Sequence, residues 1–527
     1  MHSIGTELVR ALVDHNIDTV FGIPGVHTVE LYRGLAGSGI RHVTPRHEQS
    51  AGFMADGYAR VSGRPGVAFV ITGPGLTNTL TAMAQARADS VPMLVVSGVN
   101  RLDTLGKGLG YLHELPNQRA LAKQVALHSV RVTEAGMLRP ALDRALTNAE
   151  RPGPWHVEIP LDVAGQTYTI EANAAPALAQ QNPAEPALAD LDQAIAILSA
   201  AQRPVILAGG GVRYAGAQVQ ALAEKLNAPV VQTINARGLV HDHPLGVPAS
   251  PSLEAVRALI SGSDAVLAVG TELGPTDFDM YATGTMPRMQ NLIRIDICQQ
   301  QLARRACDVA IRGDGAAVLA RLLAGLKTSN NDGSGAERAD LARREALAEI
   351  GPDMRTMCDL LSAAQQVVPG AIMVGDSAQL IYAGNLYYDH DRAGGWFNAA
   401  TGFGALGYAI PAAIGAALAA PEQKVICLTG DGGAQFSLPE FMTAKDEGVG
   451  VTFVIWNNHG YQEIETSMEA VGVSPVGCDP TPPNFEAVAA SCGLPFFSCP
   501  ANRADFTQAL KSATAQSGPS VVEIRAS

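Results

Sequence analysis

The sequence is poor in cysteine, and no two cysteines have a metal-binding or redox spacing. The chain carries seven, all in its second half, and none forms a Cys-x-x-Cys pair. An odd number without paired spacing argues against a disulfide framework and against a zinc ribbon. A reducing compartment, the cytoplasm, is therefore the predicted location.

Positive charge and long apolar runs are also scarce. Lys and Arg number 37 against 50 Asp and Glu, and the net charge of -13 argues against binding a nucleic-acid backbone. The sequence has no apolar run of about 18 residues that could span a bilayer. Its N-terminus lacks the cationic start and continuous apolar run of a signal peptide. We therefore expect neither a nucleic-acid partner nor a membrane.

Two motifs of common enzyme classes are missing as well. The sequence contains no G-x-x-x-x-G-K-[ST] phosphate loop and no G-x-S-x-G nucleophile elbow. The sequence therefore does not support a phosphate-loop nucleotide hydrolase or a serine hydrolase with a nucleophile elbow.

What the chain does contain is typical of a large globular protein. At 527 residues it is too long for one hydrophobic core, and three domains are expected. Apolar runs of strand length, such as "RPVILAGGG" and "KVICLTGDGG", alternate with longer helical patterns. This rhythm predicts an α/β fold of three domains, each a parallel sheet flanked by helices. Linker-like stretches starting at Ala172 and Thr328 divide the chain into residues 1–170, 186–328 and 345–527.

The stretch "VICLTGDGGAQFSLPEFMTAKDEGVGVTFVIWNN" places polar residues after two apolar strands. Asp431 follows the first strand and Asn458 the second, and the capping-box spacing of Ser437 and Glu440 predicts a helix between them. The carboxyl ends of both strands lie at one edge of a parallel sheet, where such sheets bind ligands. We therefore expect Asp431 and Asn458 to meet.

The residue types in this stretch suit a cation and a phosphate. Carboxylate and amide oxygens are ligands for Mg²⁺ or Ca²⁺, and two side chains leave coordination positions that phosphates fill. Gly432 and Gly433 would let backbone N–H groups approach those phosphates. The pattern resembles the GDG…NN signature of thiamine-diphosphate enzymes. That resemblance implies thiamine diphosphate and Mg²⁺ as cofactors, with Asp431, Asn458 and the backbone carbonyl of Gly460 as metal ligands.

A second motif, "RHEQSAGFMADGYARVSGRPGV", contains Glu48 after a strand over residues 40–43 and before a helix over 50–60. An acid in a first helical turn has a purely structural explanation, because it favours the helix dipole. In thiamine-diphosphate enzymes, however, a Glu in this setting bonds N1′ of the cofactor and thereby activates its C2 carbon. "FGIPGVHTVELY" and "TGPGLTNTLTAMAQARADS" also resemble the pyrimidine-binding domain of the acetolactate synthase and benzoylformate decarboxylase superfamily.

The resemblance covers the whole chain, with a pyrimidine-binding, a central and a diphosphate-binding domain in that order. It implies a homodimer or homotetramer in which two chains build each site. "GFGALGYAIPAAIG" places Leu406 where the family wedges its cofactor, with Gly404 before it, although an ordinary core Leu is the alternative. "GDSAQLIYAGN" matches a diphosphate-contacting loop, in Gln379 and more weakly in Ser377. Some relatives carry FAD against the central domain; here we favour a structural domain without it.

Decarboxylation and carboligation share all of these residues, so the substrate end of the site decides between them. Acetolactate synthases have an Arg-Phe-Asp-Asp-Arg motif that provides an Arg for a carboxylate. The corresponding stretch, "GPTDFDMYATG", has Asp277 before the Phe, and an Asp repels a carboxylate. This departure argues against acetolactate synthesis.

Other acids and a histidine complete the candidate site. Glu463, just past the metal ligands, suits a cationic substrate tail, although a solvated helix face explains it equally well and is favoured for Glu465. His113, in "YLHELPNQR", is a candidate proton donor to the reaction's enamine, although a lone His is more often structural.

The N-terminal third looks like the 5-guanidino-2-oxopentanoate decarboxylases. That likeness implies non-oxidative decarboxylation of this 2-oxo acid to 4-guanidinobutanal and CO2. An acetolactate synthase-like carboligase and a catalytically silent binding or regulatory protein are the alternatives.

Overall fold

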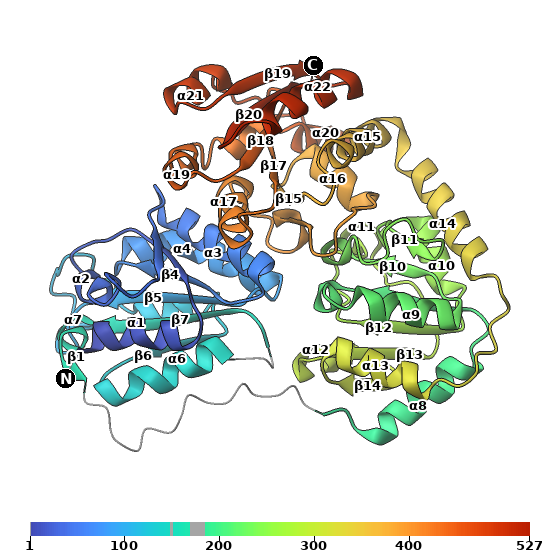
Figure 1. Ribbon diagram of the computed structural model, residues 1–527, viewed down its shortest axis with the longest axis horizontal. Helices are drawn as coiled ribbons and strands as arrows, with labels where there is room; N and C mark the ends of the chain where they lie inside the picture. Colours follow the sequence, from blue (N-terminus) through green and yellow to red (C-terminus); the bar gives the residue numbers. More distant parts are fainter. Residues whose placement is uncertain (1, 148–150, 169–184, 527) are drawn as a thin grey trace.

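The computed structural model describes residues 2–147, 151–168 and 185–526, and within these ranges the chain forms three six-stranded parallel sheets. Figure 1 shows the sheets in three domains, with the C-terminal domain above the other two. The predicted fold class, α/β with three domains, is confirmed. Among the described helices, none is both long enough and apolar enough to cross a membrane.

The first sheet has the order β3-β2-β4-β5-β7-β6. Its strands are β2 (Thr19–Gly22), β3 (Arg41–Val43), β4 (Gly66–Val70), β5 (Met93–Val99), β6 (His128–Arg131) and β7 (Pro154–Pro160). Its longer helices are α1 (Ile4–Asp14), α3 (Glu48–Ser62), α4 (Pro74–Ala88) and α6 (Leu138–Thr147). A short antiparallel pair, β1 (His2–Ser3) and β8 (Thr167–Tyr168), joins the two ends of this domain.

The second sheet has the order β11-β10-β9-β12-β13-β14. Its strands are β9 (Pro204–Ala208), β10 (Val230–Gln232), β11 (Gly246–Val247), β12 (Ala265–Val269), β13 (Leu292–Asp296) and β14 (Val309–Arg312). Its longer helices are α8 (Leu188–Ala200), α9 (Gly216–Leu226), α10 (Glu254–Ser261), α13 (Gly315–Gly325) and α14 (Gly335–Glu349).

The third sheet has the order β16-β15-β17-β18-β20-β19. Its strands are β15 (Ile372–Gly375), β16 (Trp396–Asn398), β17 (Val425–Gly430), β18 (Val451–Asn457), β19 (Phe496–Pro500) and β20 (Ser520–Arg525). Its helices include α15 (Gly351–Val367), α16 (Gln379–Leu386), α17 (Ala409–Ala419), α18 (Asp431–Ala434), α19 (Glu440–Glu447), α20 (Gln462–Ala470) and α22 (Arg503–Thr514).

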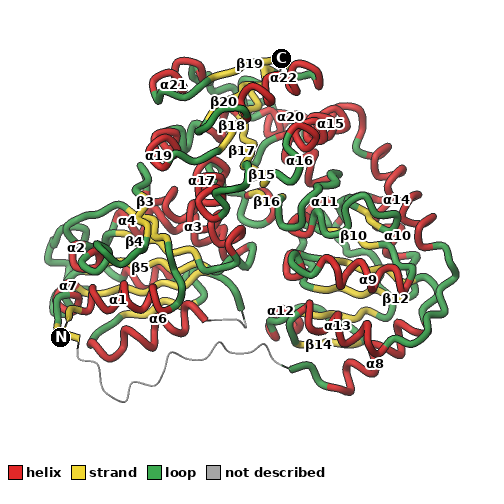
Figure 2. Tube along the Cα trace, in the orientation of Figure 1, coloured by secondary structure: helices red, strands yellow, loops and turns green. Residues whose placement is uncertain are grey.

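The first and third domains share one hydrophobic core across the contact between α3 and α17, which lie side by side in Figure 2. Small residues allow the two helices to approach closely. A Cβ added at Gly57 would lie 2.0 Å from the carbonyl oxygen of Ala412, and one at Gly415 would lie 2.0 Å from that of Met54. Each helix therefore has a glycine where the backbone of the other passes.

The two predicted linkers differ in how far the structure describes them. The linker beginning at Ala172 lies outside the described residues up to position 184. The linker beginning at Thr328 gives way to helix at Gly335, where α14 starts. This helix packs on the central sheet, and its Arg338 donates to the backbone carbonyl of Pro204 at 2.8 Å.

The helix predicted between the two motif strands is present as α19, but its capping box is not formed. Pro439 occupies the N-cap position, and the hydroxyl of Ser437 is buried without a hydrogen-bond partner among the described residues. The carboxylate of Glu440 instead accepts the backbone N–H of Arg46 at 2.9 Å. A contact with the first domain thus replaces the local cap.

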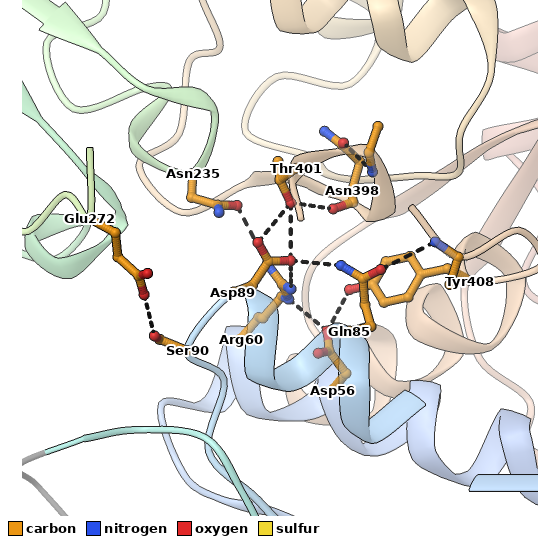
Figure 3. Close-up of polar contacts among 12 residues, drawn as sticks. Asp56, Arg60, Gln85, Asp89, Ser90, Asn235, Glu272, Asn398, Thr401 and Tyr408 are labelled. Carbon is orange, nitrogen blue, oxygen red and sulfur yellow. Dashed lines mark hydrogen bonds and ion pairs between the residues drawn. The ribbon is translucent and has the colours of Figure 1, made fainter. Parts of the chain in front are cut away.

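A buried polar network joins all three domains (Figure 3). Arg60 of α3 donates to Asp56 at 2.6 Å, to Asp89 at 2.7 Å and to Asn235 of the central domain at 3.4 Å. Asp89 also accepts from the hydroxyl of Thr401 in the third domain at 2.8 Å. The contact between domains is therefore both apolar and ionic.

Candidate functional site

Parallel pairing of β17 and β18 brings the two motif strands to one edge of the third sheet. Gly430 lies opposite Trp456 in the register, so Asp431 and Asn458 leave the sheet near each other, as predicted. Asp431 is 2% exposed, one of its carboxylate oxygens has no partner among the described residues, and burial raises its pKa. A buried carboxylate with a free oxygen is suited to a cation.

Three polar groups meet at this edge. One end of the Asn458 side-chain amide lies 3.2 Å from Oδ1 of Asp431 and 3.0 Å from the backbone carbonyl of Gly460, and with the amide oxygen at this end three oxygen atoms converge. Mg²⁺ binds oxygens at about 2.1 Å in octahedral geometry, which sets neighbouring ligands about 3 Å apart. The predicted ligands thus fit adjacent corners of such a site. Within the described ranges, no cluster of three His, Cys, Asp or Glu side chains offers an alternative.

The two asparagines of the motif have different structural roles. Asn457 is buried, donates to Glu523 at 2.7 Å and accepts the backbone N–H of His459 at 3.2 Å. Only Asn458 turns its amide toward Asp431. The first asparagine shapes the turn that the second uses.

The glycines after Asp431 are required by close neighbours. A Cβ on Gly432 would lie 2.4 Å from the ring of Tyr461, and one on Gly433 would lie 3.1 Å from Oδ2 of Asp376. Both glycines stand in the first turn after β17, next to the converging oxygens. Their predicted role in binding a diphosphate is compatible with this position.

Asp376, which sequence reasoning missed, connects the loop that carries Gly404 and Leu406 to the sheet edge that carries Asp431. It is 1% exposed and accepts the backbone N–H of Gly407 at 2.9 Å. Burial raises its pKa to about 6. The loop it holds contains Gly404, with φ +73°, and the half-buried Leu406. The sequence did contain a signal for Asp376, because it directly follows a buried strand, as Asp431 does in the GDG motif.

Gln379 and Glu463 lie beside the converging oxygens. The side-chain amide of Gln379 donates to Glu463 at 3.1 Å, and its oxygen accepts from Asn458 at 3.1 Å. Glu463 is half-buried, whereas Glu465 is exposed, as its assignment to a solvated face predicts.

A second set of candidate residues gathers at the carboxyl edge of the first sheet. Glu48 is the first residue of α3, after β3, and accepts from the side chain of Asn78 at 3.0 Å. His113 lies beyond β5 with φ +61°, and its ring centroid is 5.1 Å from that of His27, which follows β2. In both rings Nδ1 is buried and has no partner among the described residues. His27 was missed because the pairing depends on two distant loops.

The burial of His27 lowers its pKa, and His113 adds to this effect. Gln118, five residues beyond His113, is fully engaged in the domain interior. Its oxygen accepts from Thr72 and Gly73, at 2.8 and 2.9 Å. Among the described residues, the imidazoles of His27 and His113, which come from two different loops, each keep a buried Nδ1 without a hydrogen-bond partner.

The two sets are not joined within one chain. The hydrogen bonds of Glu48 are made with Asn78 and Thr79 of its own domain. Among the described residues, no hydrogen bond links Glu48 or His113 to Asp431 or Asn458.

Asp277 lies apart from both sets. It lines a cavity of about 560 Å³ between the three domains, together with Asp89, Arg213 and Glu272. Burial raises the pKa of Asp277 to about 7, and the nearby charges of Asp89 and Glu272 contribute. The network of Figure 3 forms one wall of this cavity.

Comparison with known proteins identifies the class to which this fold and site belong. The chain is a member of the thiamine pyrophosphate enzyme family. It matches the family's "N-terminal TPP binding domain" over residues 2–121, its "central domain" over 191–322 and its "C-terminal TPP binding domain" over 376–524.

Individual relatives align over most of their length. The chain is 40% identical to the "Probable 2-ketoarginine decarboxylase AruI" of Pseudomonas aeruginosa, over 99% of this chain and 93% of the relative. It is 31% identical to the "Acetolactate synthase isozyme 1 large subunit" of Escherichia coli, over 98% and 93%. It is 33% identical to the "Acetolactate synthase large subunit" of Corynebacterium glutamicum, over 86% and 74%.

Proposed function

We propose that this thiamine-diphosphate-dependent enzyme decarboxylates 5-guanidino-2-oxopentanoate, also called 2-ketoarginine, to 4-guanidinobutanal and CO2. The observation that carries the proposal is the 40% identity, over almost the whole chain, to a protein named for this activity. The Asp at position 277 supports it, because the acetolactate synthase motif has an Arg there to hold a carboxylate.

In this proposal the edge of the third sheet holds the cofactor. Asp431, Asn458 and the carbonyl of Gly460 would hold Mg²⁺. The backbone N–H groups of Gly432 and Gly433 would hold the diphosphate, and the loop with Gly404 and Leu406 would support the rings. Thiamine diphosphate, when bound, would supply a nucleophilic carbon and an electron sink for decarboxylation of the 2-oxo acid.

The first domain supplies the proton chemistry. Glu48 holds a proton at N1′ of the pyrimidine, and His113 delivers a proton to the substrate carbon before the aldehyde leaves. Glu463 is proposed to recognise the guanidinium tail. Asp277 lies apart from Glu463, in the cavity between the domains, and it enters the proposal only as the residue that replaces a carboxylate-binding Arg.

Product analysis tests the reaction. The protein, supplied with thiamine diphosphate and Mg²⁺, is offered 5-guanidino-2-oxopentanoate, pyruvate and benzoylformate in parallel. We expect rapid aldehyde release from the guanidino acid alone. Acetolactate from pyruvate would establish the carboligase that the 31–33% identities to acetolactate synthases leave as the second candidate. No turnover of any 2-oxo acid would point to a silent member.

We further propose that two chains build each site, as a homodimer or a pair of dimers. The Glu48 edge exposes Val26, Leu109 and Leu112, each at least 60% exposed. The Asp431 edge exposes Phe436, Val471 and Val476, each at least 59% exposed. Large apolar side chains around two incomplete half-sites favour mutual burial in a dimer.

Subunit complementation tests this arrangement. E48Q and D431A are each expected to be inactive, but co-expression should restore part of the activity. A mixed dimer then contains one site with both replacements and one with neither. An inactive mixture, although mixed dimers are shown to form, would contradict the proposal.

The central domain is proposed to work without FAD, and the protein to be cytoplasmic. All seven cysteines are unpaired, which suits a reducing compartment. A flavin absorption spectrum in the purified protein would contradict the proposal that the central domain works without FAD.

A further inference from the structure

The orientation of the Asn458 amide is determined by a residue outside the cation site. Trp456, 6% exposed at the end of β18, donates its indole N–H to the side-chain oxygen of Gln379 at 3.0 Å. An indole nitrogen can only donate, so the atom of Gln379 that faces it must be the oxygen.

The other end of the Gln379 amide leads to the same assignment independently. It lies 3.1 Å from a carboxylate oxygen of Glu463. An ionised carboxylate can only accept, so the atom that faces it must be the amide nitrogen. Trp456 and Glu463 together fix both ends of one amide.

This fixed amide in turn fixes the next one. The oxygen of Gln379 also lies 3.1 Å from Asn458, which must therefore present its amide nitrogen there. The oxygen of Asn458 then necessarily faces Asp431 and Gly460, at 3.2 and 3.0 Å. Three acceptors that share no proton repel one another unless a cation lies between them.

The alternative orientation would be favourable for the metal-free protein. With its amide rotated by half a turn, Asn458 would donate to Asp431 and Gly460 at the same distances. The site would then satisfy itself by hydrogen bonds, and a cation would have to displace them. What opposes this rotation is the contact with Gln379.

We propose that Gln379 is a positioning residue for the cation site, held by Trp456 and Glu463, and that it keeps the Asn458 oxygen turned toward the cation. The proposal rests on the proposed cation site at Asp431 and Asn458. In this proposal Gln379 acts on the cation indirectly, by orienting the proposed ligand Asn458. This role is in addition to the diphosphate contact expected from the sequence. Residues behind metal ligands commonly change metal affinity 10- to 100-fold, roughly, when replaced.

Binding of Mn²⁺, measured by electron paramagnetic resonance in the presence of thiamine diphosphate, tests the proposal without using activity. Q379L is expected to weaken Mn²⁺ binding by about 10- to 100-fold. Q462A is the matched control, because Gln462 also contacts the Asn458 amide, at 3.2 Å, but is exposed. We expect it to leave the affinity within about threefold, far short of that range.

A reciprocal exchange keeps the test valid if Q379L disturbs folding. Q379E alone places two carboxylates against each other and should weaken Mn²⁺ binding. Q379E combined with E463Q should restore it, because an amide at position 463 donates to the carboxylate, which still accepts from Trp456 and Asn458. Wild-type affinity in Q379L, or no rescue by the exchange, would overturn the proposal.

The D431A variant distinguishes a failure of the proposed role of Gln379 from a failure of the proposed cation site. Loss of Mn²⁺ binding in D431A, together with normal binding in Q379L, would leave the cation site in place and remove only the role of Gln379. Normal binding in D431A would refute the site itself.

Discussion

At the scale of single residues, neighbours in the sequence act on different parts of the molecule. Asn457 and Asn458 differ by one position, yet the first braces β20 through Glu523 and the second reaches Asp431. Successive side chains at a strand end point to opposite faces of the sheet. The two asparagines therefore contact different residues. Exchange of roles between the two is not possible without a shift of the whole strand.

Glu48 gives the first prediction at this scale. E48Q should lower turnover by on the order of 10²- to 10⁴-fold, because the side chain no longer exchanges a proton with the cofactor. Cofactor affinity should persist, since the residues proposed to hold the diphosphate and the cation lie on the third domain. Turnover and calorimetric titration with thiamine diphosphate measure the two effects. E465Q, at an exposed position, is the control; unchanged turnover in E48Q would refute its assigned role.

His156 gives a prediction about acid stability. It is fully buried between the hydroxyls of Ser97 and Ser129, at 2.9 and 2.8 Å, and burial lowers its pKa from 6.5 to about 3. The unfolded chain therefore binds one more proton between these pH values. Stability from this group is fully present above pH 6.5 and falls as the pH decreases toward 3, by at most about 1.4 kcal/mol per pH unit.

Denaturant midpoints measured at several pH values for the wild type and H156Q check this expectation. The variant is expected to be less stable at pH 7 but to lose stability more slowly on acidification. Parallel pH profiles for the two proteins would show that His156 does not titrate as described.

At the scale of elements, the packing of α3 on α17 depends on glycines where backbones pass. G57A adds a methyl group 2.0 Å from a carbonyl oxygen, which the backbone cannot avoid without moving. We expect a loss of about 1–3 kcal/mol, the usual cost of overpacking. G136A is the control, because Gly136 is exposed and a Cβ there meets nothing within 4 Å. Urea denaturation followed by circular dichroism compares the two, and equal midpoints would contradict the steric explanation.

Several strands and helices were predictable from the sequence because hydrophobic runs and turn residues act locally. The strands before Asp431 and Asn458 and the helix after Glu48 are found where the pattern placed them. The capping box at Ser437 was wrong because Glu440 contacts Arg46, almost four hundred positions away. The contact between Gln379 and Trp456 and the pairing of His27 with His113 also join distant segments. Local patterns carry no information about such contacts.

At the scale of the whole molecule, Arg60 is the ionic centre of the contact between domains. R60M would leave Asp56 and Asp89 buried without their cation, and breaking a buried pair in this way costs about 3–5 kcal/mol. R64M, just beyond the C-terminal end of α3, removes an exposed pair with Asp18 and should cost less than about 1 kcal/mol.

Differential scanning calorimetry is the measurement for this pair of variants. In R60M the domains should unfold in separate transitions, since their shared network is broken. A single transition at the wild-type temperature would show that the apolar contact alone holds the domains together.

The shared core of the first and third domains has a consequence for synthesis on the ribosome. The nascent chain exposes the apolar face of α3 long before α17, its partner, emerges about 350 residues later. At elongation rates of about 5–20 residues per second, this interval lasts roughly 20–70 s. We therefore expect the first domain to reach its final packing only after α17 has emerged, near the end of translation.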